Sequence, residues 1–276
     1  MSPTYQEINR PDLTVVFCLD PYNRRVRVDE LHGDLRSGLE LILQQSPDWA
    51  DKIILKARQE QVDYFIRHGW TQEAGIPGYF NGEDLFFLVH YRHNLRSHTE
   101  HAEVELSIAR KILEMQRSPV LSGGEKIKRS NLEDAEKLAL LYDIVFDIYP
   151  TPLSDPFYLR KTMEHGTVYV HMEQEGNVLS AASAEVNRKF ANAELTDCAT
   201  LPAEEGKGHM AALLARLEDI LTDQEVKCLY TICRAQSFGM NKVFYNLGFD
   251  YTGCLVNNCN IYSGLENMNV WYKMVK

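Results

Sequence analysis

The chain has 276 residues, with 29 lysines and arginines against 39 aspartates and glutamates, and a formal net charge of −10 at pH 7. With 45% hydrophobic and 25% charged residues, its composition is that of a globular protein, which excludes disordered and collagen-like chains. The length allows two packed cores, since domains commonly hold roughly 100 to 200 residues. Neither half is basic, which argues against nucleic-acid binding, because that requires clustered lysine and arginine.

Neither the hydropathy pattern nor the start of the chain predicts membrane association. No apolar run approaches the roughly 18 residues of a spanning helix, and the first ten residues lack the layout of a signal peptide. We therefore expect a cytoplasmic protein. The six cysteines include no CxxC pair, and we expect them to be free thiols, mostly buried.

The first hundred residues contain apolar patterns of both periods. Alternation predicts strands, and Leu35, Leu39, Ile42 and Leu43 share one face of a helix. The expected elements are strands at residues 14–19 and 25–31, the helix around 35–43, a strand KIILKAR at 52–58, a helix ending YFIRHGW at 64–70, a hairpin at 76–91, a linking helix over 98–117, and a Ser-Gly-Gly break at 122–124.

The second half alternates strands and helices around a glycine-rich turn. Asn131 supplies an N-cap for a helix in which Leu138, Leu141 and Val145 keep helical spacing, and a loop with three prolines follows. The other expected elements are strands at 126–129, 167–172, 178–186 and 193–200, the turn at 204–208, a helix lined by leucines over 213–221, a strand at 228–233, a helix at 240–247, and strands at 251–256 and 268–274.

The two halves share an order of elements, namely strand, helix, Gly-aromatic pair and hairpin. This repetition predicts a tandem duplication. The first copy has no glycine-rich loop before its Leu35 helix, and Ile66 stands where the second has Tyr245. We therefore expect a degenerate, non-catalytic domain over residues 1–96, a linking helix and linker over 97–124, and a catalytic domain over 125–276.

The strongest local motif is AELTDCATLPAEEGKGHMAALL, which runs from a strand through a proline and a glycine-rich turn into an amphipathic helix. Such a turn exposes backbone N–H groups at a helix N-terminus, where the helix dipole favours a pyrophosphate. The motif matches neither the P-loop nor the Rossmann pattern. A plain strand-to-helix turn is the alternative interpretation.

This segment resembles the acetyl-CoA loop of the GCN5-related N-acetyltransferases, the GNAT family. Gly208 fits the family's central glycine, whereas Glu205 replaces its usual Arg or Gln and Met210 its final small residue. The resemblance implies an α/β fold with a central mixed, mostly antiparallel sheet flanked by helices, and acetyl-CoA as co-substrate without a metal. It places CoA against Ala199, Thr200, Leu201, Gly206, Lys207, Gly208, His209 and Met210.

A second match is the helix ending Phe244-Tyr245-Asn246-Leu247-Gly248-Phe249, which is similar to a family segment whose tyrosine protonates the leaving thiolate of CoA. The resemblance assigns that role to Tyr245, with a buried core tyrosine as the alternative. The motifs LTDCATLP, LSDPFYL, ENMNVWYK and IPGYFNGEDLFFLVHY look most like the β-lysine N6-acetyltransferases, over nearly the whole chain. That group makes the osmolyte Nε-acetyl-β-lysine from β-lysine supplied by a lysine 2,3-aminomutase.

Acetyl transfer to an amine requires a base, because an ammonium group must lose a proton before its nitrogen can attack. The resemblance of AELTDCAT to the family's base-carrying strand points to Glu194, with a structural salt bridge as the alternative. Strand alternation places Glu194 and Asp197 on opposite faces, so Asp197 is not expected to share its role.

The substrate's carboxylate and second amine also need partners. In the family, the proline-rich loop and the loop between the last two strands cover the amine pocket. Each candidate there could equally be a turn residue. The candidates are Asp155, Tyr158, Asn257, Asn258 and Glu266.

Other functions remain open at this point. The amine could be diaminobutyrate, lysine or a polyamine, the protein could be a non-catalytic binding module, and it could form a homodimer. Four histidines within twelve residues could place two nitrogens near a zinc ion, but no cysteine accompanies them, and a solvated linker is the favoured interpretation. They are His90, His93, His98 and His101.

Overall fold

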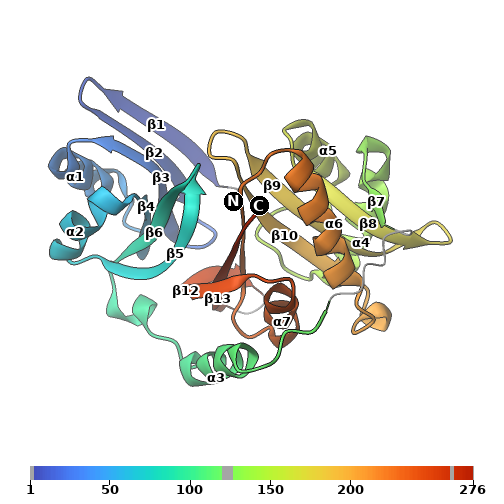
Figure 1. Cartoon of the computed structure of the whole chain (residues 1–276). Coiled ribbons are helices and arrows are strands. Elements are labelled where there is room, and N and C mark those ends of the chain that lie inside the picture. Colours follow the sequence, from blue (N-terminus) through green and yellow to red (C-terminus); the bar gives the residue numbers. More distant parts are fainter. Residues whose placement is uncertain (1–2, 120–126, 262–263, 276) are drawn as a thin grey trace.

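A computed structural model describes residues 3–119, 127–261 and 264–275, and contains two mixed β-sheets with helices packed on them (Figure 1). The first sheet has six strands in the order β1-β2-β3-β4-β6-β5, and the second has seven in the order β12-β13-β11-β10-β9-β8-β7. The predicted Ser-Gly-Gly break lies outside the described residues. No helix within them is long and apolar enough to span a membrane.

The N-terminal sheet forms where the sequence alternates. In β3, the buried Val26 and Val28 alternate with charged residues, so one face of the strand packs on helices and the other is polar. Strand β1 was not expected from the pattern. The elements are β1 (Thr4–Arg10), β2 (Leu13–Asp20), β3 (Arg25–Gly33), α1 (Leu35–Gln45), β4 (Lys52–Ala57), α2 (Gln59–Arg67), β5 (Thr71–Phe80), β6 (Glu83–Tyr91), η1 (Asn94–Ser97) and α3 (Ala102–Leu113).

The C-terminal sheet follows the predicted order, with one helix added. The prediction of a loop through the three prolines was wrong at its end, because Asp155 caps a helix that has Pro156 in its first turn. The elements are β7 (Ile127–Arg129), η3 (Leu132–Asp134), α4 (Ala135–Val145), α5 (Pro156–Glu164), β8 (Val168–Gln174), β9 (Asn177–Asn187), β10 (Asn192–Thr200), η4 (Pro202–Glu204), α6 (His209–Asp223), β11 (Cys228–Arg234), α7 (Phe238–Asn246), β12 (Asp250–Ile261) and β13 (Gly264–Met274).

The two sheets repeat one strand order. A run of antiparallel strands, three in the first sheet (β1 to β3) and four in the second (β7 to β10), ends in a parallel pair, β3 with β4 and β10 with β11. In each sheet a hairpin then completes the order, with its second strand innermost. A duplicated chain would show this order. The boundaries at 1–96, 97–124 and 125–276 stay a prediction.

The sheets pack against each other through β5 and β12, and one apolar cluster contains residues of both. A Cβ on Gly253 would lie 2.2 Å from the Glu73 carbonyl oxygen, so only glycine permits this approach. The buried Lys52 ammonium donates to the Glu73 carboxylate at 2.8 Å and to the Val256 carbonyl at 2.6 Å. These contacts join the two halves.

All six cysteines are free thiols, three buried and three partly buried. This agrees with the sequence prediction.

Candidate active site

Strands β10 and β11 separate after a short stretch of parallel pairing. Within the described residues they pair from Asn192 to Glu194 on β10, and a cavity of about 740 Å³ lies between them beyond that point. The strand edge that faces this cavity has backbone N–H and C=O groups without a partner strand, and such groups require hydrogen bonds. An extended ligand that contains amides could supply them.

The N-terminus of α6 lies at the same cavity. Gly206 and Gly208 line it with φ values of +74° and +86°, which favour glycine. Gly208 is the N-cap of this 15-residue helix, and no side chain caps it. The first-turn N–H groups therefore keep their hydrogen-bonding capacity, and with the helix dipole they form a site suited to an anion.

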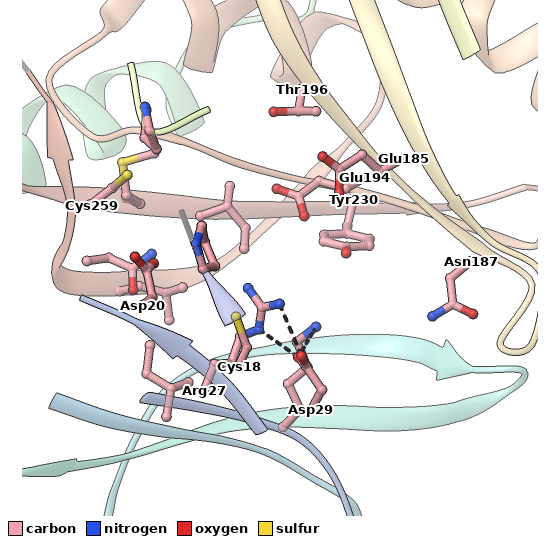
Figure 2. Close-up of a pocket in the computed structure, with 18 of the residues that line it drawn as sticks. Cys18, Asp20, Arg27, Asp29, Glu185, Asn187, Glu194, Thr196, Tyr230 and Cys259 are labelled. Atoms are coloured by element: carbon pink, nitrogen blue, oxygen red, sulfur yellow. Dashed lines mark hydrogen bonds and ion pairs between the residues drawn. The ribbon is translucent and has the colours of Figure 1, made fainter. Parts of the chain in front are cut away.

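A second cavity, of about 780 Å³, lies between the two sheets and takes lining residues from both (Figure 2). Both cavities have sizes typical of small-molecule sites. The two cavities adjoin each other, since six residues line both of them. The shared residues are Tyr149, Thr196, Asp197, Ile232, Ile261 and Met268.

Three carboxylates lie at or near this junction. Glu194 and Glu185 are directly opposed on β10 and β9, and like charges in that arrangement repel. Burial, followed by the charge of Glu185, raises the pKa of Glu194 to about 7, against the opposing charges of Lys56 and Arg27. Glu194 is therefore able to take up and release a proton near neutral pH.

Asp197 is the third carboxylate. Burial, followed by the charge of Glu185, raises its pKa to about 7, although hydroxyl donors oppose the shift. The Ser183 hydroxyl donates to it at 2.6 Å and the Tyr149 hydroxyl at 3.1 Å.

The prediction that Asp197 faces away from Glu194 was wrong. The register of β10 shifts between Thr196 and Ala199, and Asp197 has a φ of +49°. A β-bulge of this kind adds a residue to one strand and redirects the side chains beyond it. Asp197 consequently lines the same inter-sheet cavity as Glu194.

The opposite wall of the cavity comes from the N-terminal sheet, and sequence reasoning missed it. On β3, Arg25, Arg27 and Asp29 alternate with buried valines, and they lie on the face that meets the cavity. Lys56 on β4 lies beside them. The alternation in RVRVDE was the available signal, but an alternating strand more often turns its charges to solvent.

The chain resembles known acetyltransferases over most of its length. The sequence profile of the Acetyltransferase (GNAT) family matches residues 138–249. The N-acetyltransferase YodP of Bacillus subtilis is 35% identical over 277 residues, which cover 98% of this chain and 99% of that protein. The chain belongs to the GNAT family of acetyltransferases.

Two further proteins are similar to parts of the chain. The β-lysine N(6)-acetyltransferase of Methanosarcina mazei is 35% identical over 247 residues, which cover 81% of this chain and 91% of that protein. A crystal structure of an N-acetyltransferase from Staphylococcus aureus Mu50 covers 54% of this chain and 98% of its own, with a TM-score of 0.48 and 17% identity. The family match at residues 138–249 and the two relatives at 35% identity confirm the predicted family and fold, with the GNAT domain in the C-terminal half and the N-terminal sheet as an additional domain.

The GNAT loop residues predicted to hold CoA divide into two groups. The residues of the first group have partners within the protein. Ala199 is buried, and its carbonyl accepts a hydrogen bond from the Ser180 hydroxyl at 3.0 Å. The Leu201 N–H donates to a carbonyl of β9, and the Lys207 ammonium forms an ion pair with Glu204 at 2.8 Å. These three are not among the lining residues of the cavity between β10 and β11. The predicted residues that line it are Thr200, Gly206, Gly208, His209 and Met210.

Four of the predicted substrate residues have other partners. The Asp155 carboxylate accepts the Phe157 N–H at 2.9 Å as a helix cap, and Tyr158 packs on the apolar cluster beneath α4 and α5. The Asn257 amide donates to backbone carbonyls at the end of η1. Glu266 forms a two-point ion pair with an arginine of β11. None of the four lines either described cavity.

Asn258 is the predicted substrate residue that does line the inter-sheet cavity. The residue is 4% exposed, and its Oδ1 has no hydrogen-bond partner among the described residues. A buried acceptor without a partner is costly, which favours a ligand donor at this position.

Tyr245 lies on the far side of α7 from the cavity. Its hydroxyl donates to the Met115 carbonyl at 2.7 Å, and the Arg117 guanidinium lies 4.8 Å from its ring centre. Its neighbour Phe244 lines the cavity instead. The role of Tyr245 as proton donor to the thiolate stays a prediction. The position of its hydroxyl, away from the cavity, does not support that role.

Replacing Tyr245 with phenylalanine is expected to leave kcat within about threefold of the original value and to lower the free energy of unfolding by about 1 kcal/mol. The expected loss is that of one hydrogen bond. Steady-state kinetics and urea unfolding would measure the two quantities. A fall in kcat of about 10²-fold, without loss of stability, would instead give the hydroxyl the proton-donor role.

The four histidines do not gather around a common point. The His90 ring packs against Trp70, and the His98 ring bonds the Asn94 carbonyl. The described residues contain no group of three or more His, Cys, Asp or Glu that could hold a metal ion.

Proposed function

We propose that this acetyltransferase transfers acetyl from acetyl-CoA to the N6 amine of β-lysine and forms Nε-acetyl-β-lysine, acting in the cytoplasm. The observation that carries the proposal is the meeting of the two cavities at Asp197, beside Glu194. One cavity suits an anionic ligand with amides, and the other contains carboxylates suited to a cationic amine. The similarity to the β-lysine N(6)-acetyltransferase of Methanosarcina mazei supports β-lysine as the substrate.

The cavity between β10 and β11 is the proposed CoA site. The N–H groups at the start of α6 would bind the pyrophosphate, and the free edge of β10 would pair with the pantetheine amides. Lys242 lines this cavity and adds a positive charge. Glu205 and Met210, which depart from the family pattern, also line it. Glu205 therefore brings a negative charge to the proposed phosphate site.

Glu194 is the proposed base. A primary ammonium has a pKa near 10, so only about one amine in a thousand is unprotonated at pH 7. Transfer of its proton to Glu194, directly or through water, exposes the nitrogen lone pair. The nitrogen then bonds to the thioester carbon, the carbon–sulfur bond breaks, and CoA and a proton are released. A base with a pKa near the working pH is well suited to this step.

The surroundings of the cysteines support direct transfer without an acyl-enzyme. Cys198 and Cys233 both line the proposed CoA cavity. Burial raises the pKa of Cys198 far above its usual range and that of Cys233 to about 12. A thiol is a poor nucleophile until it is ionised, so neither is expected to accept the acetyl group.

The N-terminal sheet is proposed to be a degenerate copy that has lost its anion site. Helix α1 follows β3 as α6 follows β10, but Asp34 caps α1 and accepts the Ser37 N–H at 2.8 Å. A carboxylate at that position both satisfies the helix N-terminus and repels phosphate. The copy is proposed to cover residues 1–96, with a linker over 97–124 and the catalytic domain over 125–276.

The proposal is tested by acetyl-CoA-dependent release of CoA with β-lysine, α-lysine, 2,4-diaminobutyrate and spermidine at equal concentrations. We expect β-lysine to have the highest kcat/KM and the product to be acetylated at N6, as mass spectrometry and NMR would show. Such an enzyme would consume the product of a lysine 2,3-aminomutase. Preference for another amine would overturn the substrate but keep the chemistry, while absence of both turnover and acetyl-CoA binding would indicate a non-catalytic module.

A further inference from the structure

We propose that the N-terminal sheet binds the carboxylate of the amino-acid substrate through Arg27 and Lys56. The non-catalytic half would then determine that the enzyme acetylates amino acids rather than simple diamines. This inference rests on the proposed function, since it concerns the same amine pocket. It adds two positioning residues and a reason for the second domain.

Arg27 and Lys56 share one carboxylate. The Arg27 guanidinium donates from Nε and Nη2 to the two oxygens of Asp29, at 2.6 and 3.1 Å, and the Lys56 ammonium lies 2.9 Å from Asp29. Two positive charges against one negative charge leave the cluster of Arg27, Lys56 and Asp29 with a net charge of +1. Both cations are mostly buried, with side chains 28% and 14% exposed. A buried excess charge favours an anionic ligand.

The two cations also have unused donors. A guanidinium carries five N–H groups and an ammonium three. Asp29 accepts from Nε and Nη2 of Arg27, so Nη1 has no acceptor among the described residues. Asp29 and the Tyr79 hydroxyl, at 3.1 Å, account for two of the three donors of Lys56. The remaining donors suit the two oxygens of a carboxylate.

The facing wall has the opposite charge. Arg27 and Lys56 both form their ion pairs with Asp29 and not with Glu185, Glu194 or Asp197. Figure 2 shows Glu185 and Glu194 on one side of the pocket and Arg27 with Asp29 on the other. A molecule with a carboxylate at one end and an ammonium at the other fits this arrangement. A diamine without a carboxylate would place no charge against Arg27 and Lys56.

A second ammonium has a candidate acceptor nearby. The Asn258 backbone carbonyl accepts from Arg25 at 2.8 Å, and Arg25 lies two residues from Arg27 on the same face of β3. Asn258 lines the same cavity, and its buried Oδ1 has no hydrogen-bond partner among the described residues. It could accept a hydrogen bond from the amine close to the carboxylate of β-lysine.

The test compares β-lysine with 1,4-diaminopentane, which is the same molecule without its carboxylate. In the variants Arg27→Gln and Lys56→Met we expect kcat/KM for β-lysine to fall about 10- to 100-fold, mainly through KM, as for loss of a charge-assisted hydrogen bond. The kcat/KM for 1,4-diaminopentane should stay unchanged or rise. Arg27→Lys should restore part of the β-lysine activity, and the exposed Arg24→Gln should behave as wild type.

Two outcomes would overturn the inference. One is an equal loss for both amines in the variants, which would indicate a structural role. The other is calorimetry showing that β-lysine binds Arg27→Gln and the wild type with equal affinity. Calorimetry also separates the inference from the proposed function. If the wild type bound β-lysine more tightly than Arg27→Gln did but did not acetylate it, the proposed reaction would be refuted and the inference about Arg27 would stand.

Discussion

Replacing Glu194 with glutamine is expected to lower kcat by about 10²- to 10⁴-fold, the usual contribution of a general base, while acetyl-CoA binds with unchanged affinity. Glutamine keeps the size of the side chain and its hydrogen bonding but cannot accept the proton. Glu194 lines the inter-sheet cavity and not the proposed CoA cavity, so the substitution should affect only the chemical step. Single-turnover kinetics and acetyl-CoA titration would measure the two quantities.

The pH profile gives a second measure of the same role. Because the raised pKa of Glu194 is about 7, the wild-type kcat should rise with pH up to that value and then level off. The base is protonated and inactive below it. In Glu194→Gln the rise of kcat with pH should disappear from the residual rate. Any rise that remains near pH 7 would be due to Asp197, whose pKa is also raised to about 7.

Glu185→Gln is the matched control for this profile. Its charge raises the pKa of both Glu194 and Asp197. Removing that charge should move the acidic limb to lower pH and leave the kcat of the plateau within about threefold, because Glu185 itself takes no proton from the amine. If Glu194→Gln retained full kcat while Asp197→Asn lost it, the base would be Asp197.

Much of the fold could be predicted from local patterns. The alternation in β2, β3 and β8 to β10, and the glycine-rich turn before α6, each follow from short-range physics that a single segment contains. The family could be predicted for the same reason, since its loop is one continuous segment. The missed helix α5 had a start signal in Asp155 and Pro156, but the proline-rich surroundings favoured a loop.

The candidate site was harder to predict because it depends on non-local packing. The alternation of residues in β10 gives no sign of the β-bulge that redirects the Asp197 side chain. Tyr245 and Phe244 are about 100° apart around α7, so the assignment of one of them to the cavity depends on how the helix packs. The cation wall of Arg27 and Lys56 exists only because the first sheet packs over the second.

The bulge also has an expected cost in stability. In the folded protein the pKa of Asp197 is raised to about 7, mainly by burial and secondarily by the charge of Glu185, from 3.8 for an unperturbed aspartate. Between these two values the folded state holds a proton that the unfolded chain has released. The free energy of unfolding should therefore fall as pH rises from about 4 to about 7 and stay lower above that range.

Asp197→Asn should remove this dependence. An amide can accept from one of the hydroxyls of Ser183 and Tyr149 and donate to the other, so its packing is preserved. Compared with wild type, we expect little change in unfolding free energy at pH 4 and an increase of about 4 kcal/mol at pH 8, at about 1.4 kcal/mol per unit of pKa. Urea unfolding at both values measures the difference.

The exposed Asp63→Asn is the control, because its side chain is 85% exposed on α2 and its substitution should change stability by less than about 0.5 kcal/mol at either pH. Equal stability of Asp197→Asn and wild type at pH 8 would show that the Asp197 carboxylate ionises in the folded state without penalty. A gain in stability together with a loss of activity would instead show that the enzyme keeps an unfavourable buried acid at the junction of its two cavities because the reaction requires it.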